Sequence, residues 1–503
     1  MSNPLFDRLF AAGAAEAPAI DAGPRRYSYG DLMAETGRVA NALADLGVGP
    51  GDRVVVQLDK SVASLVLYLA CVRAGAPIVP LNPAYTLAEL AYFIADAQPA
   101  LIVCDPARAE GVAGLAGGAR IETLDGAGEG SLADRAAASP ARFSAVDRTA
   151  EDLAAICYTS GTTGRSKGAM LSQRALATNA QTLAALWRFT ADDVLIHALP
   201  IYHVHGLFVA VNVALMAGAA MIFQPRFEAE AVIEAMPRAT ALMGVPTYYT
   251  RLLASPRLTR EAAGPMRLFV SGSAPLLAAT HRQWQARTGH AILERYGMTE
   301  TGMNASNPYD GLRIPGAVGQ PLPGVELRVA SEAGAPASPG EIGQVEVRGP
   351  NLFSGYWRDP AKTGAAFTAD GWFRTGDLGA VGADGYLRLS GRGGDLIITG
   401  GLNVYPAEVE AAIDAVPGVV ESAVIGLPHG DFGEAVTAVV VCGSPPVSEQ
   451  AILAALQSHL AGFKRPRAIL FAGELPRNAM GKVVKAALRS AHADLYGGAV
   501  GQA

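Results

Sequence analysis

A short loop in the sequence combines three glycines with hydroxyl and basic side chains. The string YTSGTTGRSKGAM spans residues 158–170. Glycines let a backbone approach a phosphate closely and turn its N–H groups inward. The threonine and serine hydroxyls add donors, and Lys167 adds a mobile positive charge. The loop therefore predicts a polyphosphate site, although its composition alone fits an ordinary surface loop equally well.

The loop differs from the P-loop of the common NTPases. That pattern ends in Gly-Lys followed by Ser or Thr, whereas Lys167 lies between Ser166 and Gly168. If this loop holds phosphates, it belongs to another class of nucleotide-binding protein.

The string [YF]-T-S-G-T-T-G-x-x-K-G resembles the signature of the acyl-adenylate-forming superfamily, which includes acyl-CoA synthetases, luciferases and peptide-synthetase adenylation domains. Six more segments resemble the other motifs of the superfamily, in the same order: LPIYHVHG (199–206), SGSAPL (271–276), ERYGMTE (294–300), FRTGDLG (373–379), GRGGDLIITGG (391–401) and LPRNAMGKV (475–483). The resemblance covers the whole chain and implies ATP, Mg²⁺ and coenzyme A as ligands. Within the superfamily the chain looks most like bacterial malonyl-CoA synthetases, notably in MGVPTYYTRLL (243–253) and ERYGMTET.

The resemblance assigns roles in nucleotide binding and catalysis. The implied ATP-binding residues are Thr159, Ser160, Gly161, Thr162, Thr163, Gly164, Lys167, Gly272, Ser273, Ala274, Pro275, Glu294, Tyr296, Asp377 and Arg392. Thr299 would donate to the α-phosphate, Glu300 would ligate Mg²⁺, and Lys482 would bridge the attacking carboxylate and the phosphate. Each of these residues taken singly also fits a structural role, such as a turn, a helix end or a core position.

An acyl pocket for a second carboxylate needs a cation or several donors. Arg251 is the candidate cation, with a surface arginine on the same helix as the alternative. His205, Thr247 and Ser271 are weaker candidates for the same carboxylate, and Met298 would fill the apolar side of the pocket. His203 and His205 either line or gate the pocket or are structural histidines. These residues separate malonate from fatty acids but not from methylmalonate.

The segment after residue 391 carries the expected hinge and coenzyme A contacts. Gly394 occupies the hinge position, where the superfamily usually has Asp or Lys, so any side-chain interaction that biases the domain rotation is in doubt. The predicted coenzyme A contacts are Gly400, Gly401, Lys464 and Arg465. The last two fit solvated surface charges equally well.

Alternating helix and strand patterns in the first 300 residues predict an α/β fold with a mainly parallel sheet. We expect a large N-terminal domain (1–393) of alternating β/α subdomains, with a small β-rich subdomain at about 315–392. A small mobile α+β domain (394–503) should carry the catalytic lysine. Ser28 with Asp31 and Thr86 with Glu89 predict capping boxes, whereas 106–150 is interpreted as a variable surface segment.

Composition excludes several classes of protein. The net charge of −6 without a basic run argues against nucleic-acid binding. Four widely spaced cysteines indicate a reducing compartment, and we expect a cytoplasmic protein. The apolar stretch 207–223 contains Asn212 and is short for a membrane span, so we expect a buried helix followed by a strand. The sequence leaves the oligomeric state open.

The leading functional hypothesis is an AMP-forming ligase that makes malonyl-CoA through an enzyme-bound acyl-adenylate, with methylmalonyl-CoA as the alternative product. Two enzymatic alternatives are a short- or medium-chain acyl-CoA synthetase for a monocarboxylate and an adenylation enzyme that serves a carrier protein in trans. A non-enzymatic nucleotide sensor is disfavoured because Lys482 and Glu300 are both present.

Overall fold

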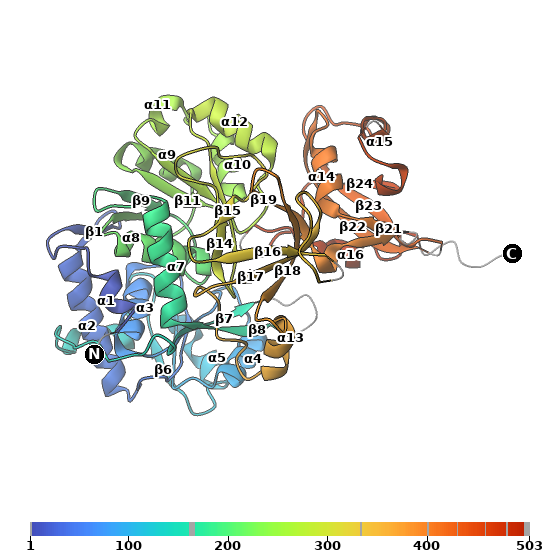
Figure 1. The fold of residues 1–503 in the computed structure, drawn as a ribbon. Helices are drawn as coiled ribbons and strands as arrows, with labels where there is room; N and C mark the ends of the chain where they lie inside the picture. Colours follow the sequence, from blue (N-terminus) through green and yellow to red (C-terminus); the bar gives the residue numbers. More distant parts are fainter. Residues whose placement is uncertain are drawn as a thin grey trace.

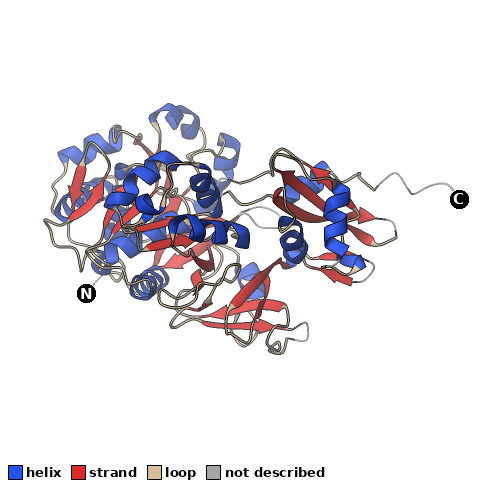
Figure 2. Ribbon diagram, turned by 90° about the horizontal axis from the view of Figure 1, so that it is seen from above, coloured by secondary structure: helices blue, strands red, loops and turns tan. Residues whose placement is uncertain are grey.

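The structure is a computed structural model, and it describes residues 3–159, 166–331, 334–399, 402–429, 431–457, 459–478 and 481–496. Figure 1 shows a large body formed by the N-terminal and central parts of the chain, with a smaller C-terminal domain beside it. Figure 2 shows the same division from above. The described residues form four β-sheets, three in the body and one in the small domain. This arrangement confirms the predicted fold class.

Two large sheets build the body. The first has the order β15-β14-β13-β12-β11-β9-β10-β1-β2, and the second has the order β6-β5-β3-β4-β7-β8. Most neighbours in the middle of each sheet are parallel. The strands of the first sheet are β1 (Pro18–Asp21), β2 (Arg26–Ser28), β9 (Val194–His197), β10 (Ala220–Phe223), β11 (Ala241–Gly244), β12 (Leu268–Ser271), β13 (Leu293–Met298), β14 (Gly302–Ser306) and β15 (Gln320–Pro321). Those of the second are β3 (Val54–Gln57), β4 (Ile78–Pro80), β5 (Leu101–Cys104), β6 (Arg120–Thr123), β7 (Leu153–Thr159) and β8 (Lys167–Ser172).

Helices cover these sheets and bury a shared apolar core. Both predicted capping boxes are present, at Ser28–Asp31 and at Thr86–Glu89, and each fixes the start of its helix. The helices of the body are α1 (Phe6–Leu9), α2 (Tyr29–Asp45), α3 (Val62–Ala74), α4 (Leu87–Ala97), η1 (Pro106–Arg108), α5 (Ala109–Ala113), α6 (Ser131–Ala138), α7 (Gln173–Leu186), η2 (His205–Val211), α8 (Asn212–Met216), α9 (Ala229–Ala235), η3 (Met236–Arg238), α10 (Pro246–Ala254), α11 (Arg260–Ala263), α12 (Ala278–Thr288) and α13 (Pro360–Ala366).

The β-rich part and the small domain follow in order. An antiparallel sheet contains β16 (Glu326–Ala330), β17 (Gly343–Arg348), β18 (Phe373–Val381) and β19 (Leu387–Arg392). The short helix η4 (Gly393–Asp395) then leads into the C-terminal sheet. That domain contains β20 (Ile397–Thr399), β21 (Leu402–Val404), α14 (Pro406–Asp414), β22 (Val419–His429), β23 (Gly433–Cys442), α15 (Glu449–Gln457), η5 (Gly462–Lys464), β24 (Ala468–Phe471) and α16 (Lys485–Ala491). Its core is separate from that of the body.

The structure adds detail that the sequence pattern did not give. The segment 106–150 is not merely a variable surface stretch, because β6 pairs with β5 at the edge of the second sheet and α6 packs on α2. The apolar stretch 207–223 does form a helix and a strand, as predicted, but it begins as the π-helix η2. No helix in the described ranges is long and apolar enough to cross a membrane.

Candidate active site

The carboxyl ends of the parallel strands collect the predicted site residues. The strands β9, β11, β12 and β13 end next to one another in the first sheet. The segments that follow them carry His205, Thr247, Gly272 and Thr299 in turn. In open α/β sheets, ligands bind outside the carboxyl ends of the strands. The topology therefore gathers at one sheet edge motifs that are up to 100 residues apart in the sequence.

Glu300 and Lys167 both contact Tyr356. The Tyr356 hydroxyl donates to Oε1 of Glu300 at 3.0 Å, and Nζ of Lys167 lies 5.0 Å from the centre of the same ring. Lys167 begins β8 and pairs with Thr159 at the end of β7. Burial raises the pKa of Glu300, while the charges of Arg392 and Lys167 oppose that rise. A nearby cation would therefore stabilise the ionised carboxylate.

The surroundings of Glu300 fit a magnesium ion. Mg²⁺ is usually held by one or two carboxylates together with substrate phosphates, rather than by a cage of protein ligands. Within the described ranges, no group of three or more His, Cys, Asp or Glu side chains is arranged to hold a metal alone. Glu300 supplies a buried carboxylate of the right chemistry next to the phosphate-loop lysine, so it fits a metal shared with ATP.

A polar cluster joins the first sheet to the β-rich sheet. The Tyr296 hydroxyl donates to Oδ2 of Asp377 at 2.5 Å, and Nε of Arg392 lies 3.1 Å from Oδ1. Asp377 and Arg392 are direct neighbours in the β18–β19 ladder. The carboxylate of Asp377 is therefore fixed from both sides, in a position to accept hydrogen bonds from vicinal hydroxyls of a ligand.

Lys482 faces this cluster from the C-terminal domain. Its loop is closed by two hydrogen bonds with Asn478, from the Lys482 amide to Oδ1 and from the Asn478 amide to the Lys482 carbonyl. Gly481 has a φ of +71°, and a Cβ there would lie 2.9 Å from Oγ1 of Thr247. Burial and the charge of Arg392 lower the pKa of Lys482, whereas Asp377 opposes that change. The lysine loop therefore lies against the nucleotide and acyl sides of the body.

Two histidines lie at the base of the acyl side. His205 is buried, its Nδ1 is 3.2 Å from Oγ of Ser273, and its Nε2 has no partner among the described residues. Burial lowers the pKa of His205 well below the usual range and that of His203 to about 4. Both imidazoles are therefore neutral at pH 7. Ser271 is two residues before Ser273, and its buried hydroxyl also lacks a partner in the described part of the chain.

Arg295 was not among the predicted site residues. Its guanidinium lies directly under Gly272, where an added Cβ would be 2.3 Å from Nη1. The residue is 3% exposed, and Nε and Nη2 have no hydrogen-bond partner among the described residues. Burial lowers the pKa of Arg295 to about 9. The only signal in the sequence was a basic residue inside a motif strand, next to Tyr296.

The structure places the remaining predicted residues as follows. Arg251 is exposed on α10, one turn beyond Thr247. Met298 and Thr299 are half-buried at the end of β13, and Ala274 and Pro275 follow β12. Glu294 contacts His281 and the Gly316 amide, so its role in ATP binding stays a prediction.

The predicted coenzyme A contacts and the predicted hinge residue lie outside the clusters described above. Lys464 binds both carboxylate oxygens of Glu408 at 2.7 and 2.8 Å, and Arg465 follows it at the end of η5. Gly394 lies in η4 with open space around its Cα. Ser160, Gly161, Thr162, Thr163, Gly164, Gly400 and Gly401 lie outside the described residues.

Comparison with known families decides the class. The AMP-binding enzyme family matches residues 8–357, and the AMP-binding enzyme C-terminal domain matches residues 408–482. The chain belongs to the AMP-binding enzymes. Among curated AMP-binding relatives, the mitochondrial malonate–CoA ligase ACSF3 of Mus musculus is 36% identical over 96% of this chain and 90% of its own length. The feruloyl-CoA synthase of an Amycolatopsis species is 35% identical over 94% and 95%.

Solved AMP-binding enzymes match over the whole chain. ATP-bound MatB from Rhodopseudomonas palustris is 58% identical and superposes with a TM-score of 0.97, covering 99% of this chain and 100% of that one. Apo MatB, at the same identity and coverage, gives a TM-score of 0.87. The domain arrangement described here is therefore closer to that of the ATP-bound structure, in agreement with the position of Lys482 against the body.

Proposed function

We propose that this AMP-binding enzyme is a ligase that converts malonate, ATP and coenzyme A to malonyl-CoA, AMP and pyrophosphate. The names of its relatives support a CoA ligase, but they include both malonate–CoA ligases and a feruloyl-CoA synthase. The choice of acid therefore depends on the chemistry of the acyl side of the site.

The buried guanidinium of Arg295, whose Nε and Nη2 have no hydrogen-bond partner among the described residues, carries the proposal for a dicarboxylic acid. A buried charge without a partner destabilises the folded state. When one member of a buried ion pair is removed, the remaining charge costs about 3–5 kcal/mol. Such a group is retained where a ligand supplies the counter-charge. The unpartnered Ser271 hydroxyl and the neutral His205 lie nearby and offer further hydrogen bonds. A second carboxylate on a short acid would satisfy this set, whereas an aromatic or alkyl group would leave it unpaired.

Arg251 then has a second place in the proposal. It lies on the same face of α10 as Thr247, which touches the lysine loop at Gly481. Its charge is therefore nearer the mouth of the site than that of Arg295. We assign Arg295 to the floor of the acyl pocket and Arg251 to its entrance, where it attracts the dianionic acid.

The first reaction step joins the acid to ATP. A carboxylate oxygen of malonate attacks the α-phosphorus, the Pα–O–Pβ bond breaks, and pyrophosphate leaves with the electron pair. Negative charge grows around the α-phosphate, and preorganised cations stabilise it. Lys482 and Thr299 face that charge, Lys167 and the phosphate loop hold the leaving group, and Asp377 holds the ribose. Glu300 would hold Mg²⁺, which neutralises phosphate oxygens when bound.

The second step transfers the acyl group. The sulfur of coenzyme A attacks the carbonyl carbon, the thiol proton is released, and AMP leaves with the electron pair of the broken C–O bond. Lys482 is not needed for this step, because the phosphate is then the leaving group of an already formed anhydride. Rotation of the C-terminal domain about η4 would remove the lysine loop and admit the thiol.

A competition assay tests the choice of acid. The purified protein is incubated with ATP, Mg²⁺, coenzyme A and an equimolar mixture of acetate, malonate, methylmalonate, succinate and octanoate, and the thioesters are identified by mass spectrometry. The proposal predicts malonyl-CoA as the main product, with methylmalonyl-CoA as the nearest competitor. Acetyl-CoA or octanoyl-CoA as the main product would leave the ligase chemistry intact and refute the dicarboxylate pocket.

A further inference from the structure

Lys60 lies away from the residues that the proposed reaction uses, and its buried amino group contacts His197 at the end of β9. It follows β3 in the second sheet, and Nζ lies 2.8 Å from Nδ1 of His197 and 2.7 Å from the His197 carbonyl oxygen. Nζ is also 4.3 Å from the centre of the Phe223 ring. Within the described ranges the hydrogen-bond partners of Nζ are both atoms of His197, and neither is a carboxylate. The side chain of Lys60 is therefore held by hydrogen bonds to His197 rather than by an ion pair.

The contacts of His197 define which ring nitrogen carries the proton. Nε2 lies 2.9 Å from the carbonyl oxygen of Gly206, and His197 is 1% exposed. A carbonyl oxygen only accepts, so Nε2 must hold a proton. The neutral ring then has an acceptor at Nδ1, which receives a hydrogen bond from the Lys60 amino group. Burial lowers the pKa of Lys60 well below the usual lysine value, and the amino group donates in either protonation state. Lys60 therefore favours, from the Nδ1 side, the same tautomer that the Gly206 carbonyl requires at Nε2.

Gly206 connects this chain of contacts to the acyl side. It is the second residue of η2, and a Cβ there would lie 2.0 Å from the Pro200 carbonyl oxygen, so the backbone is held closely. His205 precedes it and directs Nδ1 toward Ser273. π-helical turns are rare in proteins, and those that occur often lie at functional sites. The position of the His205 ring thus depends on the backbone atom that His197 binds.

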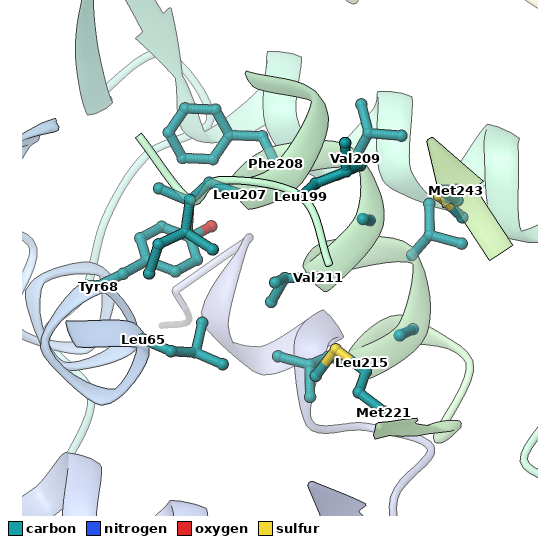
Figure 3. Close-up of a cluster of buried hydrophobic side chains, with 14 of the residues drawn as sticks. Leu65, Tyr68, Leu199, Leu207, Phe208, Val209, Val211, Leu215, Met221 and Met243 are labelled. Atoms are coloured by element: carbon teal, nitrogen blue, oxygen red, sulfur yellow. The ribbon is translucent and has the colours of Figure 1, made fainter. Parts of the chain in front are cut away.

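A small cavity borders the first turn of η2. A cavity of about 20 Å³ lies between the β3–α3 segment and the start of η2, and Leu58, Tyr68 and Leu207 are among its lining residues. Figure 3 shows Tyr68 and Leu207 side by side at this contact. Farther along, the Tyr68 ring packs on Phe208 and its hydroxyl binds Asn212. The hydrogen bond from His197 to the Gly206 carbonyl is therefore a polar contact to the first turn of η2 beside this cavity.

We propose that Lys60 is a positioning residue of the acyl site. Its amino group donates to Nδ1 of His197 and so supports the Nε2–H tautomer, and His197 holds the Gly206 carbonyl and with it the imidazole of His205. The inference rests on the proposed function, because that function places His205 beside the acid. It links the second sheet, which carries the phosphate loop, to the acyl side of the first.

The test compares Lys60→Met, His197→Phe and the double variant in malonate-dependent pyrophosphate release. Lys60→Met should raise the KM for malonate by about 10- to 100-fold, the size expected when a binding group is displaced, and change the KM for ATP by less than about twofold. Each single variant leaves one buried polar partner unsatisfied, whereas the double variant replaces both by apolar groups, which can be nearly neutral for stability. The double variant should therefore regain thermal stability without regaining malonate affinity.

Nitrogen-15 spectra of histidine-labelled protein provide a readout that does not depend on turnover. His197, assigned from the signal missing in His197→Phe, should be the pure Nε2–H tautomer in the wild type and a mixture in Lys60→Met. Lys362→Met, which breaks an exposed ion pair with Asp359, is the matched control and should leave every readout unchanged. A folded Lys60→Met with the wild-type malonate KM, a malonate KM that recovers with stability in the double variant, or an unchanged His197 tautomer would overturn the proposal. If the wild type does not turn over malonate, the proposed function fails, and the spectra still decide whether Lys60 sets the tautomer.

Discussion

The Tyr296 hydroxyl donates a 2.5 Å hydrogen bond to Asp377, across the boundary between the first sheet and the β-rich sheet. Arg392 pairs with the other oxygen of the same carboxylate. A single carboxylate can bind two vicinal hydroxyls only if it is held in one orientation. The contacts with Tyr296 and Arg392 hold the Asp377 carboxylate in this way.

Loss of that orientation should appear in the affinity for ATP. Tyr296→Phe is expected to raise the KM for ATP by about 3- to 10-fold, the value of one ordinary hydrogen bond, with little change in the KM for malonate. Asp377→Asn removes the carboxylate itself and should have the larger effect. Steady-state kinetics with each substrate varied separately provides the measurement. Equal changes in both KM values would show that Tyr296 supports the whole site rather than the ribose contact.

Lys482 should separate the two half-reactions. Lys482→Ala is expected to slow malonate-dependent pyrophosphate release by at least about 100-fold, because a charge at the transition state is lost. Transfer from chemically prepared malonyl-adenylate to coenzyme A should stay within about threefold of the wild type. Lys485→Ala, three residues away and paired with Glu410, is the control. Comparable losses in the two half-reactions of Lys482→Ala would contradict the assigned role.

Replacing Arg295 should increase the stability of the protein and decrease its activity on malonate. Arg295→Met removes a buried charge that has no ion-pair partner among the described residues and should raise the free energy of unfolding, by about 1–4 kcal/mol. The sign follows from the pKa of Arg295, which burial lowers to about 9: Arg295 is still charged at pH 7, but the folded state binds its proton less tightly than the unfolded chain, so the charge costs stability. Malonate turnover should fall by at least about 100-fold.

Chemical denaturation and pyrophosphate release measure the two effects of Arg295→Met. Arg251→Met, at an exposed position, should leave stability unchanged and weaken malonate binding to a smaller degree. A destabilised Arg295→Met protein that retains malonate turnover would show that the guanidinium is structural.

The pH profile of kcat/KM should be narrower than ordinary carboxyl and amino groups would give. Burial raises the pKa of Glu300, so its carboxylate becomes protonated, and loses Mg²⁺, at a higher pH than an exposed glutamate. Burial also lowers the pKa of Lys482, so its charge is lost below the usual lysine range. Activity should therefore fall on both sides of neutrality. Glu300→Gln should abolish the acid limb together with most activity, and an acid limb at the position of an exposed glutamate would contradict the assignment.

The hinge should tolerate alanine but not proline. Gly394 has open space around it and no positive φ, so Gly394→Ala should behave like the wild type in both half-reactions. Gly394→Pro restricts rotation about the backbone, and it should preserve adenylate formation but slow thioester formation by about 10-fold or more. Single-turnover assays of the two steps distinguish them. Equal loss of both steps in Gly394→Pro would argue against a hinge at this residue.

The sequence predicted the parts of the fold and site that depend on local patterns. Capping boxes at Ser28 and Thr86, alternating strands and helices, and ordered motifs lie in contiguous residues, so they could be recognised without coordinates. The segment 106–150 was underestimated because β6 is a half-buried edge strand and lacks a continuous apolar run.

The contacts that decide function were harder to predict. The proposed role of Arg295 depends on Gly272, which follows a different strand and lies over its guanidinium. Lys60 and His197 are 137 residues apart, and no spacing rule joins them. Such relationships depend on the order of strands in the two sheets, which residue patterns do not specify.

The most direct test of the account compares malonate with propionate, which has the same number of carbons and lacks the second carboxylate. Pyrophosphate release by the wild type is measured with ATP, Mg²⁺ and coenzyme A over a range of each acid. Because a site built around a charged group rejects an analogue without it by about 10⁴-fold, the account predicts a kcat/KM for malonate at least about 1,000-fold above that for propionate. Similar values for the two acids would show that the pocket does not read a second carboxylate, and would contradict the proposed function.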